Sequence, residues 1–286
     1  MGSAVASRLA SLGHQVRVWN RSRARAQPLI DQGLGWADSP ADLAAQAEVV
    51  ITLLTNEQAL DDVYMSPQGL LSNPDAGITF IEMSTVRPAK QVEMAARAAA
   101  AGVRYLECPV GGSVGPAKDG KLIGFVGGAA DDLVPVRALL LQLCRRLEHV
   151  GPHGAGATMK LAINLPLMVY WQTLGEALSL IEPLGLDPAR VVDILSDTSG
   201  GPNMLKVRGP MIAQALAGTA GDAVTVDLAT MRKDVRTMLD HAQSQHRALP
   251  LTAETLKNLD RAAAEGLDAA DCAQFPVWWL RDGGKA

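Results

Sequence analysis

The sequence predicts an α/β domain over residues 1–152, followed by an all-helical domain over residues 153–286. In the first part, short β-branched runs alternate with alanine-rich segments of helical period, the pattern of a mostly parallel sheet covered by helices. In the second part, nearly every apolar pattern is helical. One long apolar segment, residues 158–184, predicts a helix that joins the two domains and bends near Pro166.

Composition and charge favour a protein that handles small molecules. The 286 residues carry a formal net charge of −4, which provides no basic surface for nucleic acid or an anionic membrane. The three cysteines lack C-x-x-C spacing and the five histidines form no H-E-x-x-H motif, so neither a disulfide framework nor a metal site is expected. Apolar stretches break before about 20 residues and the N-terminus lacks a signal-peptide pattern, which predicts a cytoplasmic protein.

The first segments correspond to the second half of a β-α-β unit. Residues 2–12 predict an amphipathic helix closed by Gly13, and residues 15–20 predict a strand. In a dinucleotide-binding unit a strand and the motif G-x-G-x-x-G come first, and Gly2 stands where the last glycine would be. Either the start codon was assigned too far downstream or the chain is truncated. We favour the first explanation, because the rest of the pattern is intact and a missing central strand leaves unpaired backbone.

The loop after this strand bears on the cofactor. An acidic residue there would bind the ribose hydroxyls of NAD, whereas Asn20 followed by Arg21 and Ser22 suits the 2′-phosphate of NADP. We therefore expect NADP, with NAD as the second choice. A plain basic loop before a helix is the alternative.

The rest of the α/β domain alternates regularly. Strands are expected at residues 49–56, 79–85, 103–110, 120–128 and 146–150, and helices at residues 23–32, 40–46, 61–71, 89–101 and 131–144. Ligands collect at the carboxyl ends of such strands, which makes Thr55, Ser84 and Thr85 candidates for binding. A helix cap before Pro88 is an equally good interpretation of Ser84 or Thr85.

A glycine-rich segment, residues 111–117, follows the strand at residues 103–110. Glycines expose successive backbone N–H groups, so Gly111, Gly112 and Ser113 are candidates for holding a carboxylate. A tight loop without a ligand is the alternative.

A turn containing Gly154 and Gly156 opens the long helix. Lys160 and Asn164 are four residues apart and therefore share one helix face, which pairs a proton donor with an amide. Apolar surroundings can tune a lysine for general acid–base work. A solvated helix face is the plain alternative.

The all-helical part continues with further helices. They are expected at residues 187–196, 204–216, 225–243, 252–265 and 269–274. Lys233 and Asp234 are adjacent, and because neighbouring residues on a helix do not face each other, no salt bridge between them is expected. The aromatic segment 275–279 predicts internal packing or a subunit contact.

Six short motifs occur in order along the chain. They are Met1-Gly2, Asn20-Arg21-Ser22, Ser84-Thr85-x-x-Pro88, Pro109-Val110-Gly111-Gly112-Ser113-Val114, Gly154-x-Gly156-x-x-x-Lys160-x-x-x-Asn164 and Lys233-Asp234. Together they resemble the β-hydroxyacid dehydrogenase family, which contains 3-hydroxyisobutyrate dehydrogenase and tartronate semialdehyde reductase. The resemblance spans nearly the whole chain and implies an N-terminal Rossmann domain, an all-helical domain joined through the long helix, and a cleft between them.

The resemblance also implies roles for individual residues. Lys160 would be the acid/base residue, Asn164 would orient the substrate, and Gly111, Gly112 and Ser113 would hold its carboxylate. The residues implied to bind the cofactor are Met1, Gly2, Asn20, Arg21, Ser22, Leu54, Thr55, Thr85 and Lys233. The implied reaction is NADP-dependent hydride transfer between a small 3-hydroxy acid and its semialdehyde, in a homodimer or homotetramer without a nucleic-acid or membrane partner.

Some features depart from the family pattern. Residues 111–113 read Gly-Gly-Ser where the family commonly has Ser-Gly-Gly, residues 163–164 read Ile-Asn where it often has two asparagines, and Pro166 and Trp171 follow in the same helix. An imine reductase of the same architecture is one alternative function, and a degenerate, non-catalytic dehydrogenase-like module is another. Lys160 favours hydroxyacid chemistry, because a developing alkoxide needs a matched proton donor.

Overall fold

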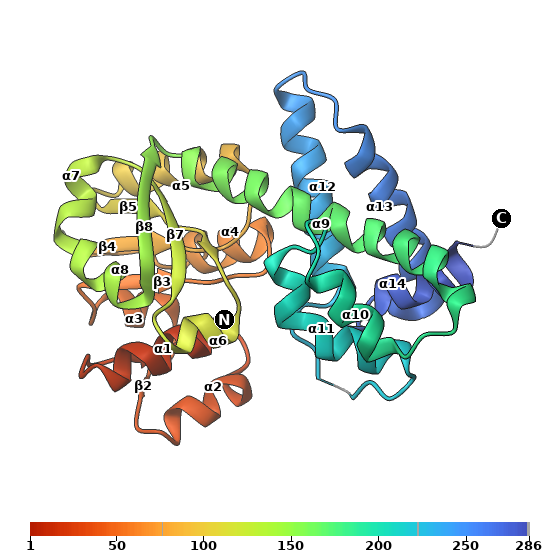
Figure 1. The fold of residues 1–286 in the computed structure, drawn as a ribbon. Coiled ribbons are helices and arrows are strands. Elements are labelled where there is room, and N and C mark those ends of the chain that lie inside the picture. Colours follow the sequence, from red (N-terminus) through yellow and green to blue (C-terminus); the bar gives the residue numbers. More distant parts are fainter. Residues whose placement is uncertain (76, 222, 285–286) are drawn as a thin grey trace. The chain divides into compact units, whose positions relative to one another are not determined.

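The protein folds into two compact units. The computed structural model describes residues 1–75, 77–221 and 223–284. Unit 1 comprises Met1–Leu161 and unit 2 comprises Ala162–Ala286, and the junction falls inside helix α9, Ala155–Ile181 (Figure 1). The expected long helix is therefore present, and it continues through Pro166.

Unit 1 alternates strands and helices as expected, but it adds a short strand at Gly35–Trp36 and a short helix at Val114–Lys118, and the strand expected at residues 103–110 is divided in two. Its strands are β1 Arg17–Val18, β2 Gly35–Trp36, β3 Val49–Thr52, β4 Thr79–Glu82, β5 Arg104–Glu107, β6 Val110–Gly111, β7 Leu122–Gly127 and β8 Cys144–Gly151. Its helices are α1 Gly2–Ser11, α2 Arg23–Ile30, α3 Pro40–Ala44, α4 Glu57–Met65, α5 Pro88–Ala100, α6 Val114–Lys118, α7 Ala130–Leu133 and α8 Arg137–Leu143.

A six-stranded sheet forms the centre of unit 1. Its order is β3-β4-β5-β7-β6, with β8 paired to β7. β3, β4 and β5 are parallel, whereas β7 runs antiparallel to β5 and β6. Phe80 and Ile81, adjacent on β4, are both 0% exposed and belong to two different apolar clusters, so both faces of the sheet are covered. This arrangement confirms the predicted α/β fold of the Rossmann type.

Strands β1 and β2 form a separate, two-stranded parallel sheet. Of the strand predicted at residues 15–20, only Arg17 and Val18 pair, because β2 is the only strand beside them in the described part of the chain. Within the described residues β3 likewise pairs with β4 alone, and Val49 and Ile51 on β3 stay partly exposed. Among the described residues, no strand therefore occupies the position between β1 and β3 where a Rossmann unit carries its first strand.

Two predicted helices of unit 1 have different limits in the structure. The helix predicted at residues 61–71 is α4, which starts earlier because the Asn56 side chain accepts a hydrogen bond from the N–H of Ala59 (2.9 Å) and caps it. The helix predicted at residues 131–144 is divided into α7 and α8 by a 3₁₀ turn around Pro135.

Unit 2 is all-helical, as expected. After α9 come a 3₁₀ turn at Glu182–Leu184 and the helices α10 Pro188–Ser196, α11 Asn203–Leu216, α12 Leu228–Ser244, α13 Pro250–Ala262 and α14 Gln274–Trp278, with π-helical turns at Ala263–Leu267 and Trp279–Gly283. None of the helices in the described ranges is long and apolar enough to cross a membrane.

The end of unit 2 corrects the predicted helix at residues 269–274. The carboxylate of Asp271 accepts hydrogen bonds from the N–H groups of Thr225 (2.7 Å) and Ala273 (2.9 Å), and the helix starts only after this turn. The aromatic segment packs inside the unit, because the side chains of Phe275 and Trp278 are stacked at 5.6 Å and are 0% and 5% exposed.

Candidate active site

The candidate acid/base residue lies near the start of α9. This helix begins directly after Gly154, whose φ of +94° favours glycine. Lys160 is in the second turn and is only 9% exposed, which is rare for a lysine. Asn164 is partly buried and lies one turn further along the same helix. The plain alternative of a fully solvated helix face is therefore wrong for Lys160.

A buried carboxylate caps the start of α9. Glu107, at the end of β5, is 0% exposed. Its Oε1 accepts hydrogen bonds from the N–H groups of Gly154 (2.6 Å) and Gly156 (2.9 Å), and its Oε2 accepts one from Ala157 (3.2 Å). Burial raises the pKa of Glu107 to about 7, although these three donors favour the ionised form. Sequence analysis missed this residue, and the only signal was an acidic residue inside an apolar strand.

A second buried carboxylate holds the carboxyl ends of β3 and β4. Glu82 accepts hydrogen bonds from the Thr52 hydroxyl and from the Ser84 N–H (2.6 Å). The Ser84 hydroxyl in turn accepts one from the N–H of Leu54 (2.7 Å). Ser84 therefore joins two strand ends, and the N-cap position of α5 is occupied by Arg87. This network fixes the backbone around three candidate cofactor residues, Leu54, Thr55 and Thr85.

The two buried carboxyl groups make stability depend on pH. Burial raises the pKa of Glu82 from 4.5 to about 7, so between these values the folded protein binds more protons than the unfolded chain. We therefore expect the free energy of unfolding to fall as pH rises from about 4.5 to about 7, by at most ~3 kcal/mol per carboxyl group. Denaturant titrations at several pH values measure this slope. It should become shallower in Glu82→Gln and stay unchanged in the surface control Glu148→Gln; equal slopes in all three proteins would contradict the assignment.

The start of α1 and the loop after β1 are the candidate dinucleotide contacts. α1 has no side-chain cap at Met1 and no acidic residue in its first turn, so its N–H groups suit an anionic pyrophosphate. Gly2 lies beside the end of β3, because a Cβ on it would be 3.9 Å from the Cβ of Leu53. In the loop, Asn20 Oδ1 accepts a hydrogen bond from the Ser22 N–H (2.9 Å), which shapes the turn and leaves Arg21 exposed.

The candidate carboxylate cradle is shorter than the loop expected at residues 111–117. Gly111 ends β6, and α6 starts at Val114 with Ser113 as its N-terminal boundary. Between them, Gly112 has a φ of +123°, and a Cβ there would lie 2.9 Å from Leu122 Cδ2. Only glycine fits this turn, which presents the exposed Ser113.

In unit 2, the adjacent pair Lys233 and Asp234 corrects a prediction. The Lys233 Nζ lies 2.6 Å from Asp234 Oδ1, so the salt bridge that helix geometry argued against is present. The long, flexible lysine side chain bends towards the neighbouring carboxylate. The prediction considered only the directions in which the two side chains leave the helix backbone. Lys233 lies on α12 and stays a candidate for binding the cofactor.

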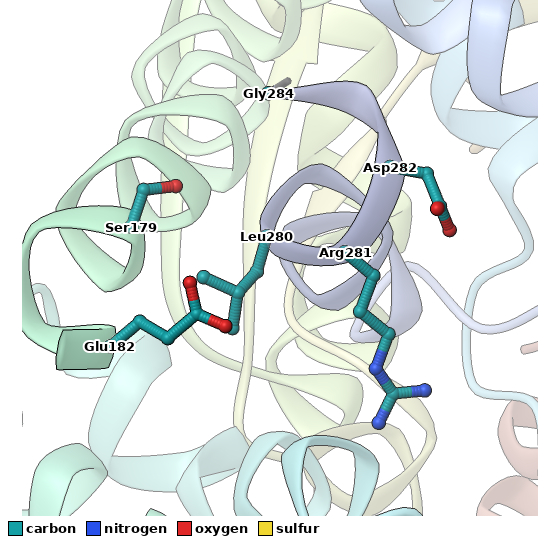
Figure 2. A pocket seen from close by; sticks show the side chains of 6 residues that line it. All are labelled: Ser179, Glu182, Leu280, Arg281, Asp282 and Gly284. Atoms are coloured by element: carbon teal, nitrogen blue, oxygen red, sulfur yellow. The ribbon is translucent and has the colours of Figure 1, made fainter. Parts of the chain in front are cut away.

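Unit 2 also contains a pocket near the end of α9. It has a volume of about 550 Å³ and its lining comprises Ser179, Glu182, Leu280, Arg281, Asp282 and Gly284, with Ser179 and Glu182 on one wall in Figure 2. No predicted site residue lines it. The described residues also contain no group of three or more His, Cys, Asp or Glu side chains that could hold a metal ion.

Comparisons with known proteins agree with this architecture. Residues 1–151 match the NAD binding domain of 6-phosphogluconate dehydrogenase, and residues 154–276 match the family described as NAD-binding of NADP-dependent 3-hydroxyisobutyrate dehydrogenase. The 3-hydroxyisobutyrate dehydrogenase of Pseudomonas aeruginosa is 34% identical over 256 residues, which cover 88% of this chain and 86% of that protein.

Two further proteins extend the comparison. The 3-sulfolactaldehyde reductase of Escherichia coli is 30% identical over 95% of this chain and 90% of its own length. The solved structure of Psf3 in complex with NADP+ and 2-OPP has a TM-score of 0.87 and 27% identity, and the match covers 97% of this chain and 96% of Psf3. The family matches span both halves of the fold, and the protein therefore belongs to the β-hydroxyacid dehydrogenase family of NAD(P)-dependent oxidoreductases.

Proposed function

We propose that the protein uses NADPH and NADP+ to interconvert a small 3-hydroxy acid and its semialdehyde. The observation that carries the proposal is the nearly buried Lys160 on a helix whose next turn carries Asn164. A lysine enclosed in this way can hold a proton at one place for a developing alkoxide. The two relatives named above, a hydroxy acid dehydrogenase and an aldehyde reductase, support the same class of reaction.

The proposed reaction divides the work between chain and cofactor. The bound nicotinamide supplies or accepts the hydride. In reduction, Lys160 gives a proton to the alkoxide oxygen, and in oxidation it takes the proton back. Gly111, Gly112 and Ser113 hold the substrate carboxylate through backbone N–H groups and the hydroxyl, and Asn164 orients the substrate.

The remaining candidates bind the cofactor in this proposal. Met1 and Gly2 at the start of α1 approach the pyrophosphate, and the loop Asn20, Arg21 and Ser22 binds the adenosine end. The other proposed cofactor contacts are Leu54, Thr55, Thr85 and Lys233. We assign residues 1–152 to a dinucleotide-binding domain, whose loop 111–113 also contacts the substrate. Residues 153–286 form the domain for substrate binding and oligomerisation, from which Lys233 also contacts the cofactor. A homodimer or homotetramer and a cytoplasmic location stay predictions from the sequence.

The test combines cofactor binding with turnover. NADPH binding is titrated by fluorescence, and NADPH oxidation is then followed with short semialdehydes and with matched aldehydes that lack the carboxylate. The carboxylate should raise kcat/KM at least about tenfold, because its charge-assisted hydrogen bonds are lost in the matched aldehyde. Reduction of a cyclic imine but of no semialdehyde would favour an imine reductase and overturn the proposal.

In the part of the chain that the structure describes, β1 pairs only with β2 and β3 only with β4, which suggests a second arm of the titration. It uses a version in which a strand and a glycine-rich turn precede α1. If only this version binds NADPH, the phosphate cradle requires that strand and the enzyme proposal stands. If neither version binds a nicotinamide cofactor, the proposal is wrong and a non-catalytic module is favoured.

Arg21 should determine the preference for NADPH. The exposed guanidinium can pair with the 2′-phosphate, which NADH lacks, so Arg21→Ala is expected to raise the Kd of NADPH about tenfold or more and to leave the Kd of NADH within about twofold. Arg137→Ala removes another exposed charge, from α8, and serves as the control. An equal weakening of NADPH and NADH binding in Arg21→Ala would show that the residue does not read the 2′-phosphate.

A further inference from the structure

We propose that Glu107 is a positioning residue, whose carboxylate holds the first turn of α9 and thereby sets the place of Lys160. The proposal rests on the function proposed above for Lys160. All residues that carry it lie in unit 1. It concerns how the proton donor is held, and Glu107 itself need not touch the substrate.

The Glu107 carboxylate accepts hydrogen bonds from three backbone N–H groups at the start of α9. Both oxygens of Glu107 take part, with Gly154 and Gly156 on one and Ala157 on the other, at 2.6 to 3.2 Å. The partners are 47 to 50 residues away in sequence, so these bonds tie the helix to the sheet. His153, just before the helix, adds a hydrogen bond from its Nε2 to the carbonyl of Tyr105 on β5 (2.9 Å).

Two glycines leave just enough room for this carboxylate. A Cβ on Gly127 of β7 would overlap Glu107 Oε1 and would lie 2.9 Å from the nitrogen of Gly156. A Cβ on Gly156 would overlap the carbonyl oxygen of Phe125 and lie 3.2 Å from Glu107 Cδ. Strand and helix therefore close on the carboxylate from two sides, which leaves it no freedom to follow a displaced helix.

The position of the helix start determines the position of Lys160. Lys160 is three residues beyond Ala157 on a continuous helix, so a shift of the first turn moves its backbone as well. Its side chain is 9% exposed and has little space to compensate. A displacement of about 1 Å at a reacting group can cost about 100-fold in rate.

Protonation of Glu107 should weaken its hydrogen bonds to the N–H groups of α9. Burial raises its pKa to about 7, and a protonated carboxyl would direct an O–H towards N–H donors. Charge interactions link Glu107 to Glu82 on β4 and to Tyr105 and Cys108 on and next to β5. The neighbouring elements also carry titratable residues, namely Cys144, Arg145, Arg146, Glu148 and His149 on β8, His153 before α9 and Lys160 in it, whereas β7 has none. We therefore expect kcat to fall as the pH drops below about 7, where Glu107 becomes protonated.

The first experiment compares Glu107→Gln and Glu107→Asp with wild type, using Glu148→Gln on β8 as the matched control. We expect Glu107→Gln to lower kcat about 10- to 100-fold per NADPH-binding site, with the Kd of NADPH within about twofold. The wild-type fall in kcat below pH 7 should vanish in Glu107→Gln, while Glu107→Asp, which keeps the charge, should recover part of kcat. An unchanged kcat per binding site, or an acid limb that persists in Glu107→Gln, would overturn the proposal.

The second experiment separates this proposal from the proposed function. Hydrogen exchange of residues 154–161 is measured without substrate, and Glu107→Gln should speed it about tenfold or more while α5 is unaffected. If Glu107→Gln does not fold, the same segment of the wild type is compared at pH 8 and pH 5.5, after correction for intrinsic exchange. Relative to α5, residues 154–161 should be more protected at pH 8, where Glu107 is ionised. Relative protection that is equal at both pH values or higher at pH 5.5 rejects the role of Glu107, whereas absence of semialdehyde turnover with higher protection at pH 8 rejects only the function assigned to Lys160.

Discussion

Lys160→Met is expected to lower kcat for semialdehyde reduction by about 10²- to 10⁴-fold, the usual contribution of a positioned acid or base. Methionine fills a similar volume without a proton to give, so the buried site should keep its packing. Because the substitution removes proton transfer and leaves the proposed cofactor residues intact, the Kd of NADPH should change by less than about threefold. Steady-state kinetics and fluorescence titration measure the two quantities.

The control for this substitution is Lys121→Met. Lys121 is 66% exposed and pairs with Asp119, so its replacement removes the same charge from unit 1 without touching the candidate site. Its kcat should stay within about twofold of wild type, as expected for a surface substitution. A kcat in Lys160→Met that matches the control would show that another group supplies the proton.

Gly127→Ala is expected to lower the free energy of unfolding by about 3–5 kcal/mol, through overpacking and the loss of at least one buried hydrogen bond. The added Cβ would overlap Glu107 Oε1 and approach the Gly156 nitrogen to 2.9 Å. Neither neighbour can retreat, because one is a fully buried carboxylate and the other is helix backbone. Chemical denaturation at neutral pH measures the loss.

Gly115→Ala is the matched control for this prediction. Gly115 lies in α6 and has no positive φ, and no atom of the described residues outside its own helix turn lies within 4 Å of an added Cβ. Alanine is the better helix former, so the free energy of unfolding should stay equal or rise by up to about 1 kcal/mol. A loss in Gly127→Ala no larger than in Gly115→Ala would contradict the close approach of β7 and α9.

Local patterns were sufficient for the order and type of most elements. The apolar runs at β3 to β5, the glycines that end helices, and the long apolar segment of α9 are all features of consecutive residues. The same locality explains the placement of Lys160 and Asn164, because four residues on a helix always make about one turn. Boundaries were less predictable, as the early start of α4 at the Asn56 cap shows.

The contacts that build the candidate site come from segments far apart in the chain. Glu107 meets the N–H groups of α9 across 47 to 50 residues, and Leu54 meets Ser84 across 30. In the sequence, Glu107 is a single acidic residue in an apolar strand, and no local pattern predicts which groups it binds. The salt bridge between Lys233 and Asp234 is close in sequence but depends on a side-chain conformation that backbone geometry does not fix.

The sequence by itself therefore determined the α/β and all-helical halves, the joining helix and the residues able to carry acid–base chemistry, because helical and strand periods are properties of neighbouring residues. Only the tertiary structure decided that Lys160 is enclosed, that Glu82 and Glu107 are buried at the strand ends, and that β1 and β3 lie in separate sheets. Burial and strand pairing depend on which distant segments fold together. A hydrogen bond between such segments therefore cannot be predicted from the local sequence around either partner.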